Sequence, residues 1–196
     1  MWGAWVLRSI GAQKMEVGQG PRLANLATGL ARDLDIEAPR LYLTSSGGPN
    51  ALVVRASGSA LAMATPMLEL YTRTELEAVV AHCLVRLRDH RRMRRTEVSV
   101  ALALPARSLR GFSARSPLGF SARSPLGPSA SPAGGSLGPP GLEDDLATVA
   151  VTGYPPGLAS AISKAEPARG RFAPLWFVSD SSQLSPERRV AELSNI

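Results

Sequence analysis

Apolar residues recur every three or four positions early in the chain and predict an amphipathic helix over 21–35, with Pro21 in its first turn. Short apolar runs follow at 41–44, 51–54 and 60–64. Residues that favour turns, mainly Gly, Ser, Pro and Asn, separate these runs. Such spacing predicts a small antiparallel sheet after the helix.

A second helix is predicted where Thr74 and Glu77 form a Thr-x-x-Glu capping box directly before an apolar run that ends at Leu87. His82 falls in the middle of this run, so we expect it to be buried. Beyond Leu87 the same helix becomes cationic. The basic residues are Arg88, Arg91, Arg92, Arg94 and Arg95.

Three further helices are predicted near the end of the chain. Acidic residues at 143–145 favour the positive end of a helix dipole, and Gly153 is suited to closing that helix. A short helix follows over 155–164. A last one begins with Ser185 as the cap and Pro186 in the first turn.

A low-complexity segment interrupts this pattern at 106–141, where 21 of 36 residues are Gly, Ser or Pro. Such a composition buries too little apolar surface to offset the entropy of ordering, so we predict a disordered linker. The octapeptide GFSARSPL occurs there twice in tandem, at 111–118 and 119–126. We therefore expect one domain formed by 21–105 and 142–196, preceded by an N-terminal segment, 1–20, that either lies at a membrane interface or packs on the domain.

Composition excludes only a few classes of protein. The chain of 196 residues is 44% hydrophobic, as a globular domain is, and no apolar stretch is long enough to span a bilayer. Its single cysteine excludes an internal disulfide and a cysteine-rich zinc module. The net charge of +6 comes from 20 Arg against 2 Lys, a bias that nucleotide composition explains without a function.

Several motifs together resemble one family. They are PNA at 49–51, ELEAVVAH at 75–82, TGYPPGLASAISKA at 152–165, LWFV at 175–178 and SPERRVAEL at 185–193. In this order they resemble the HtpX-type membrane zinc metallopeptidases, a family that also includes CAAX-prenyl-protease-like enzymes. The resemblance implies an α+β fold, mainly helical and zincin-like, with a small antiparallel sheet and, here, a long disordered insertion.

The same resemblance implies a degenerate metal site. The family carries HExxH, in which two histidines bind zinc and the glutamate is the general base. Here His82 is the only retained ligand, Cys83 stands at the general-base position and Arg86 at the second-ligand position. The third-ligand position corresponds to Gly141 if Asp145 matches the family's aspartate, and Glu143 is a weak substitute.

We therefore expect zinc to be absent or weakly bound, because a guanidinium has no lone pair to donate and adds a fixed positive charge. A thiol also cannot replace a carboxylate as proton shuttle. His90 lies eight residues after His82, about 12 Å by axial rise, too far along a helix to complete the site. A role for Cys83 as a nucleophile is disfavoured because His82 points about 100° away on the helix.

Three hypotheses follow. The first is a catalytically inactive homologue, a pseudopeptidase, that retains a scaffold for a peptide or protein partner. The second is an active zinc metalloendopeptidase with a rearranged ligand set such as His82, Cys83 and Glu143. The third is a decayed copy without selected function, which the tandem repeat and the absence of a membrane hairpin favour.

The resemblance places a substrate groove along the strand at 60–64, where an extended peptide could add to the sheet edge. The groove candidates are Asn50, Ala62 and Ala64. The basic run from Arg88 to Arg95 suggests contact with an anionic membrane surface, or else a solvated helix end. Nucleic acid is disfavoured because no aromatic platform accompanies the arginines. We expect a cytoplasmic protein, or one peripheral at the inner face of the membrane, without a membrane-spanning helix.

Overall fold

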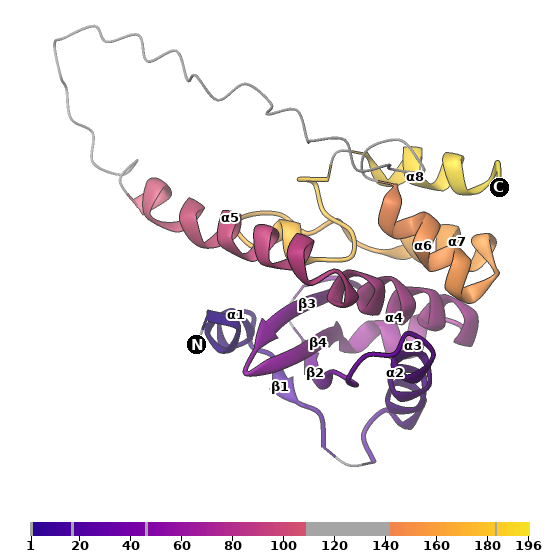
Figure 1. The fold of residues 1–196 in the computed structure, drawn as a ribbon, viewed down its shortest axis with the longest axis horizontal. Helices are drawn as coiled ribbons and strands as arrows, with labels where there is room; N and C mark the ends of the chain where they lie inside the picture. Colours follow the sequence, from indigo (N-terminus) through magenta and orange to yellow (C-terminus); the bar gives the residue numbers. More distant parts are fainter. Residues whose placement is uncertain (1, 17, 46, 109–141, 183) are drawn as a thin grey trace, which may run out of the picture.

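The computed structural model describes residues 2–16, 18–45, 47–108, 142–182 and 184–196, with side chains omitted for 103–108. An α+β fold results, as predicted (Figure 1). The helices are α1 (Trp2–Ser9), α2 (Pro21–Asp33), α3 (Thr65–Leu70), α4 (Arg73–Arg88), α5 (His90–Ser108), α6 (Glu143–Thr152), α7 (Pro155–Lys164), η2 (Ala173–Leu175) and α8 (Pro186–Leu193). The strands are β1 (Gln13–Lys14), β2 (Arg40–Thr44), β3 (Ala51–Ala56) and β4 (Gly58–Ala64).

The sheet is mixed, so the predicted purely antiparallel sheet is wrong. Its strand order is β1-β2-β4-β3, and β2 pairs with β4 in parallel. The connection from β2 to β3 is too long for a tight hairpin, whereas β3 turns sharply into β4 at Gly58, whose φ is 118°. Strand β4 therefore enters the gap between β2 and β3 and runs in the same direction as β2.

Helix α4 is the centre of the fold. It runs between the sheet and helices α6 and α7, and it also packs against α2 (Figure 1). Ten of its 16 residues are buried, which explains why it shows no single apolar face. The predicted helix is confirmed, but its capping box is not Thr74 with Glu77.

The capping box is formed by Thr72 and Glu75, because the helix begins two residues earlier than predicted. The predicted pair and the observed pair both have Thr-x-x-Glu spacing. The observed pair is the one whose glutamate, Glu75, is buried. The Glu75 carboxylate also accepts a hydrogen bond from Lys164 at 2.8 Å and another from Ser160, both on α7. The cap of α4 is thereby tied to a helix that lies beyond 109–141.

Helix α5 is separate from α4, since the chain breaks at Asp89. It continues to Ser108, so the first residues of the linker predicted at 106–141 are helical. The rest of that linker, with its tandem repeat, lies outside the described residues. Within the described ranges, no helix is both long and apolar enough to cross a membrane.

Asn50 joins the two parts of the chain on either side of 109–141. Its side-chain amide donates to the carbonyl oxygens of Glu166 and Val178, each at 2.7 Å. Its side-chain oxygen accepts from the backbone N–H groups of Ala51 and Val178. Only 2% of Asn50 is exposed, so these bonds have little competition from water.

The Glu75 carboxylate predicts a specific loss of stability in acid. Burial alone raises its pKa, but hydrogen bonds from Lys164, Ser160 and Thr72 outweigh burial and hold the pKa at about 2. A carboxylate whose pKa is depressed on folding stabilises the protein above its unfolded pKa. That stability is lost as the pH falls from about 5 toward 2, by an amount on the order of 2 kcal/mol.

Urea unfolding between about pH 7 and pH 2.5 measures this loss. The variant Glu75→Gln, which can still form the capping box, should lose less stability in acid than the wild type. Glu77→Gln on the same helix is the matched control and should keep the wild-type slope. The reverse result would place the important carboxylate at Glu77.

Removing the Asn50 amide should destabilise the fold by about 2–4 kcal/mol, because buried carbonyl and N–H groups would lose their partners. Chemical denaturation of Asn50→Ala measures this difference. Asn25→Ala, at an exposed position of α2, is the control and should change the free energy of unfolding by less than about 0.5 kcal/mol. Equal effects of the two substitutions would contradict a clamping role for Asn50.

Candidate functional site

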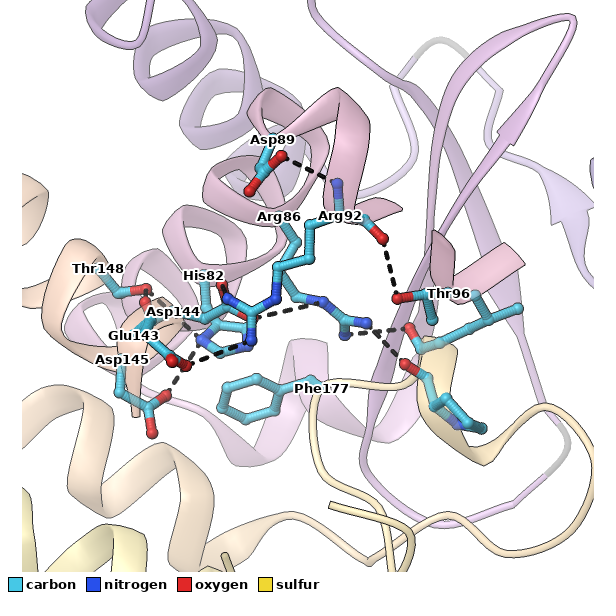
Figure 2. Close-up of polar contacts among 12 residues, drawn as sticks. His82, Arg86, Asp89, Arg92, Thr96, Glu143, Asp144, Asp145, Thr148 and Phe177 are labelled. Atoms are coloured by element: carbon cyan, nitrogen blue, oxygen red, sulfur yellow. Dashed lines mark hydrogen bonds and ion pairs between the residues drawn. The ribbon is translucent and has the colours of Figure 1, made fainter. Parts of the chain in front are cut away.

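His82 lies on α4 at the centre of a buried polar cluster. Its Nδ1 atom is 3.2 Å from Asp145 Oδ1 and 3.5 Å from the Thr148 hydroxyl, both on α6. The Phe177 ring packs edge-on against the imidazole, with ring centroids 5.0 Å apart. Figure 2 shows Asp145, Thr148 and Phe177 gathered around this ring. Burial lowers the pKa of His82, although Asp145 opposes that shift.

Asp145 is fully buried and is held by Arg189 of α8. Arg189 donates from Nε and Nη2 to the two carboxylate oxygens, at 2.7 and 2.6 Å. Burial alone raises the pKa of Asp145, but Arg189 and His82 outweigh burial and lower the pKa to about 2. The ionised carboxylate accepts a hydrogen bond from the Nδ1–H group of His82, so the lone pair of the neutral imidazole lies on Nε2. A carboxylate partner on the second nitrogen is typical of histidines that bind metals.

Arg86 lies one helical turn after His82, at the second-ligand position that the resemblance indicated. Its guanidinium donates to the carbonyl oxygens of Pro174 at 2.6 Å, Trp176 at 2.9 Å and Leu175 at 3.3 Å. Asp144 Oδ2 is 3.9 Å from Arg86 Nε. Burial lowers the pKa of Arg86, and the Asp144 carboxylate opposes this. The side chain therefore acts as a cationic clamp on one short segment (Figure 2).

That segment, 174–178, lies along the outer edge of β3. Trp176 forms an antiparallel bridge with Leu52, and the Phe177 N–H donates to the Ala51 carbonyl at 2.7 Å. Farther along the same edge, the Arg55 N–H donates to the Glu97 carboxylate of α5 at 2.6 Å. The chain itself thus covers the free edge of β3, the one that does not pair with β4.

The predicted groove along 60–64 is wrong in its position. Strand β4 has β2 on one side and β3 on the other, so no edge is available there for an added peptide. Ala62 and Ala64 are fully buried and Asn50 is almost so. Asn50 holds the backbone together instead of facing a groove.

The remaining predicted site residues do not gather around His82. Cys83 is fully buried, and burial raises its pKa to about 12. Glu143 Oε2 lies 3.4 Å from Arg92. His90 contacts Arg55 of β3. Gly141 lies outside the described residues.

The donor set around His82 does not fit zinc. Within the described ranges, no three His, Cys, Asp or Glu side chains are placed to share one metal ion. Where a second nitrogen ligand would stand, the structure has a guanidinium that is already bonded to backbone carbonyl groups. The chemistry of these residues is that of a hydrogen-bonded core.

The buried ion pair of Asp145 with Arg189 is not among the residues predicted for the site. A signal for it exists, because Arg189 lies four residues before Leu193 and so shares the buried face of α8. A buried arginine requires a carboxylate partner, and 143–145 supplies the acidic residues of the neighbouring sequence. The helical pattern could therefore have indicated this ion pair, but it could not have selected Asp145 from its neighbours.

A cleft of about 600 Å³ opens beside the covered edge. Its lining combines aromatic, cationic and small residues with one acidic residue, among them Gly48, Glu166, Arg169, Arg171, Phe172 and Trp176. The Arg171 guanidinium stacks over the rings of Trp5 and Phe172, at 5.0 and 4.7 Å from their centroids.

Comparison with known proteins gives a consistent set of relatives, although no family model matches the chain. It is 33% identical over 82 residues to a protein named Protease HtpX homolog from Halobacterium salinarum, covering 41% of this chain and 28% of that protein. It is 30% identical over 100 residues to the Streptococcus gordonii protein of the same name, covering 50% and 33%. Plastoglobule-localized metallopeptidase 48 of Arabidopsis thaliana is 42% identical over 71 residues, covering 35% and 21%. These three matches thus span a third or less of each named relative's length.

The ion pair of Asp145 with Arg189 should be strongly coupled. Asp145→Ala and Arg189→Ala should each lower the free energy of unfolding by about 3–5 kcal/mol, because each leaves an unpaired buried charge. The double variant should lose clearly less than the sum of the single losses. Urea denaturation of the four proteins gives the coupling energy.

Arg92 with Asp144 is the matched surface pair, joined at 2.8 Å with the arginine 45% exposed. Its coupling energy should stay below about 1 kcal/mol. Additive losses for the Asp145 and Arg189 pair would contradict the buried network.

Proposed function

Because the chain is related in sequence to the HtpX-type metallopeptidases, we propose that it is a catalytically inactive homologue that acts by binding and not by hydrolysis. The observation that carries this proposal is the Arg86 clamp. Its guanidinium stands one turn after His82 and is bonded to three successive carbonyl groups. A zinc ion bound as in an HExxH site would find no second imidazole on this face of α4.

Two physical effects act together against a metal at His82. A guanidinium offers no lone pair, and its positive charge repels a dication at close range. Moving Arg86 aside would leave the carbonyl oxygens of 174–176 without their donor, which costs free energy where they are shielded from water. Metal binding would therefore have to disrupt the segment that covers β3.

The general-base position gives independent support. Cys83 is fully buried, and with a pKa raised to about 12 it stays a neutral thiol at physiological pH. A neutral buried thiol can neither accept a proton from water nor pass one to a leaving amine. Cys83 packs in the core as a small apolar residue.

The binding role follows from what the fold leaves accessible. The edge of β3 is covered by 174–178, so a peptide partner would not add a strand there. We place a peptide or protein partner at the neighbouring cleft, whose arginines and aromatic rings suit an acidic or aromatic segment. The retained caps, ion pairs and buried amide favour a maintained scaffold over a decayed copy.

Metal analysis and activity together test the proposal. The full chain, purified without added metal, should contain well below one zinc per molecule and should not cleave unfolded protein substrates. It should also unfold in a cooperative thermal transition, since a decayed copy would not. One zinc per chain, lost in His82→Ala together with chelator-sensitive cleavage, would instead establish the active enzyme with a rearranged ligand set.

A paired substitution tests the assignment of Arg86. The double variant Cys83→Glu/Arg86→His restores HExxH and should bind zinc at least about tenfold more tightly than the wild type, because it adds an imidazole on the same helix face. Cys83→Glu/Arg86→Lys keeps the positive charge and is the matched control, which should show no gain. Equal zinc affinity in the two variants would contradict the role given to Arg86.

A further inference from the structure

Helix α5 has an outer face that nothing in the described structure covers. The inner face of α5 carries Met93 and Val100, each of which is 2% exposed. At 3.6 residues per turn, Arg91, Arg95, Val98 and Leu102 fall within about 40° of one line on the opposite side. Figure 1 shows α5 continuing beyond the sheet, and Arg91, Arg95, Val98 and Leu102 are all exposed.

The orientation of this face is fixed by contacts near the start of the helix. The Glu97 carboxylate accepts the Arg55 N–H of β3, and His90 contacts the Arg55 side chain. Arg92 turns toward α6, where it pairs with Asp144 at 2.8 Å. These bonds hold one side of α5 against the domain and leave the other side outward.

The outer face is cationic at one end and apolar at the other. Arg91, Arg94 and Arg95 are exposed and have no hydrogen-bond or ion-pair partner among the described residues. Val98 is 55% exposed and Leu102 is 70% exposed. One exposed apolar residue is ordinary, but two that continue a line of arginines form an amphipathic stripe.

We infer that this stripe binds an anionic lipid surface, with the arginines at the headgroups and Val98 and Leu102 inserted among them. Arginines near such a surface attract anionic headgroups, and the apolar end adds area that leaves water. Nucleic acid fits less well, because an exposed valine and leucine have no partner on a phosphate backbone and no exposed aromatic ring accompanies them on the described part of α5. The inference does not depend on the proposed loss of catalysis.

Vesicle sedimentation with the full chain tests this inference. The chain should bind vesicles that contain about 30% phosphatidylserine and should bind much less to pure phosphatidylcholine, with binding weakened by salt. Arg91→Gln/Arg95→Gln should lower the partition coefficient roughly 30-fold, about fivefold for each charge. Val98→Ser/Leu102→Ser should also weaken binding but should leave its salt dependence in place.

The control Arg32→Gln/Arg188→Gln removes two exposed arginines from α2 and α8, so it lowers the net charge equally. It should change binding less than about threefold if the stripe, and not total charge, is responsible. An equal loss in this control, or equal binding to both kinds of vesicle, would overturn the inference. So would unchanged vesicle binding by Arg91→Gln/Arg95→Gln together with weaker binding of a single-stranded oligonucleotide, which would identify nucleic acid as the partner.

Discussion

The structure depends on how five successive carbonyl groups, those of residues 174–178, are satisfied. Arg86 takes the first three, Arg189 takes that of Phe177, and Asn50 takes that of Val178. Asn50 and Arg86 precede residues 109–141, whereas 174–178 follow them. Side chains from the first part of the chain therefore position the backbone of the second, and both the covered edge of β3 and the surroundings of His82 result from this.

The same interactions explain how the site differs in kind from a metal centre. A metal ion would gather side chains from α4 and α6 by coordination. Here the positive charge between these helices is the guanidinium of Arg86. Its partners are backbone carbonyl oxygens and the Asp144 carboxylate. The histidine keeps a carboxylate on Nδ1, and that carboxylate is balanced by Arg189. The buried charges around His82 are therefore balanced by side chains of the protein itself, Arg189 against Asp145 and Arg86 against Asp144.

Local signals predicted α2, α6, α7 and α8, since residues such as Pro21, Gly153 and Ser185 mark helix ends through backbone chemistry. They predicted neither α1 and α3 nor the break between α4 and α5 at Asp89. The resemblance in sequence led to the hypothesis that Arg86 stands at a second-ligand position, and in the structure its guanidinium is bonded to backbone carbonyl groups. It could not predict that β4 would lie between β2 and β3, because strand order depends on contacts distant in sequence. It also could not choose between two overlapping capping boxes, since only the burial of Glu75 beneath α7 separates them.

In the hydrogen bonds to 174–178, the acceptors are backbone groups and the donors are side chains, so the two sides tolerate substitution differently. Every amino acid carries a carbonyl group, so the recipient residues can change identity without losing the interaction, as long as the backbone path is kept. The donors have no such freedom, because an amide and two guanidinium groups are required at fixed places. Natural variants of this chain should therefore drift at Pro174 while remaining constant at Asn50, Arg86 and Arg189.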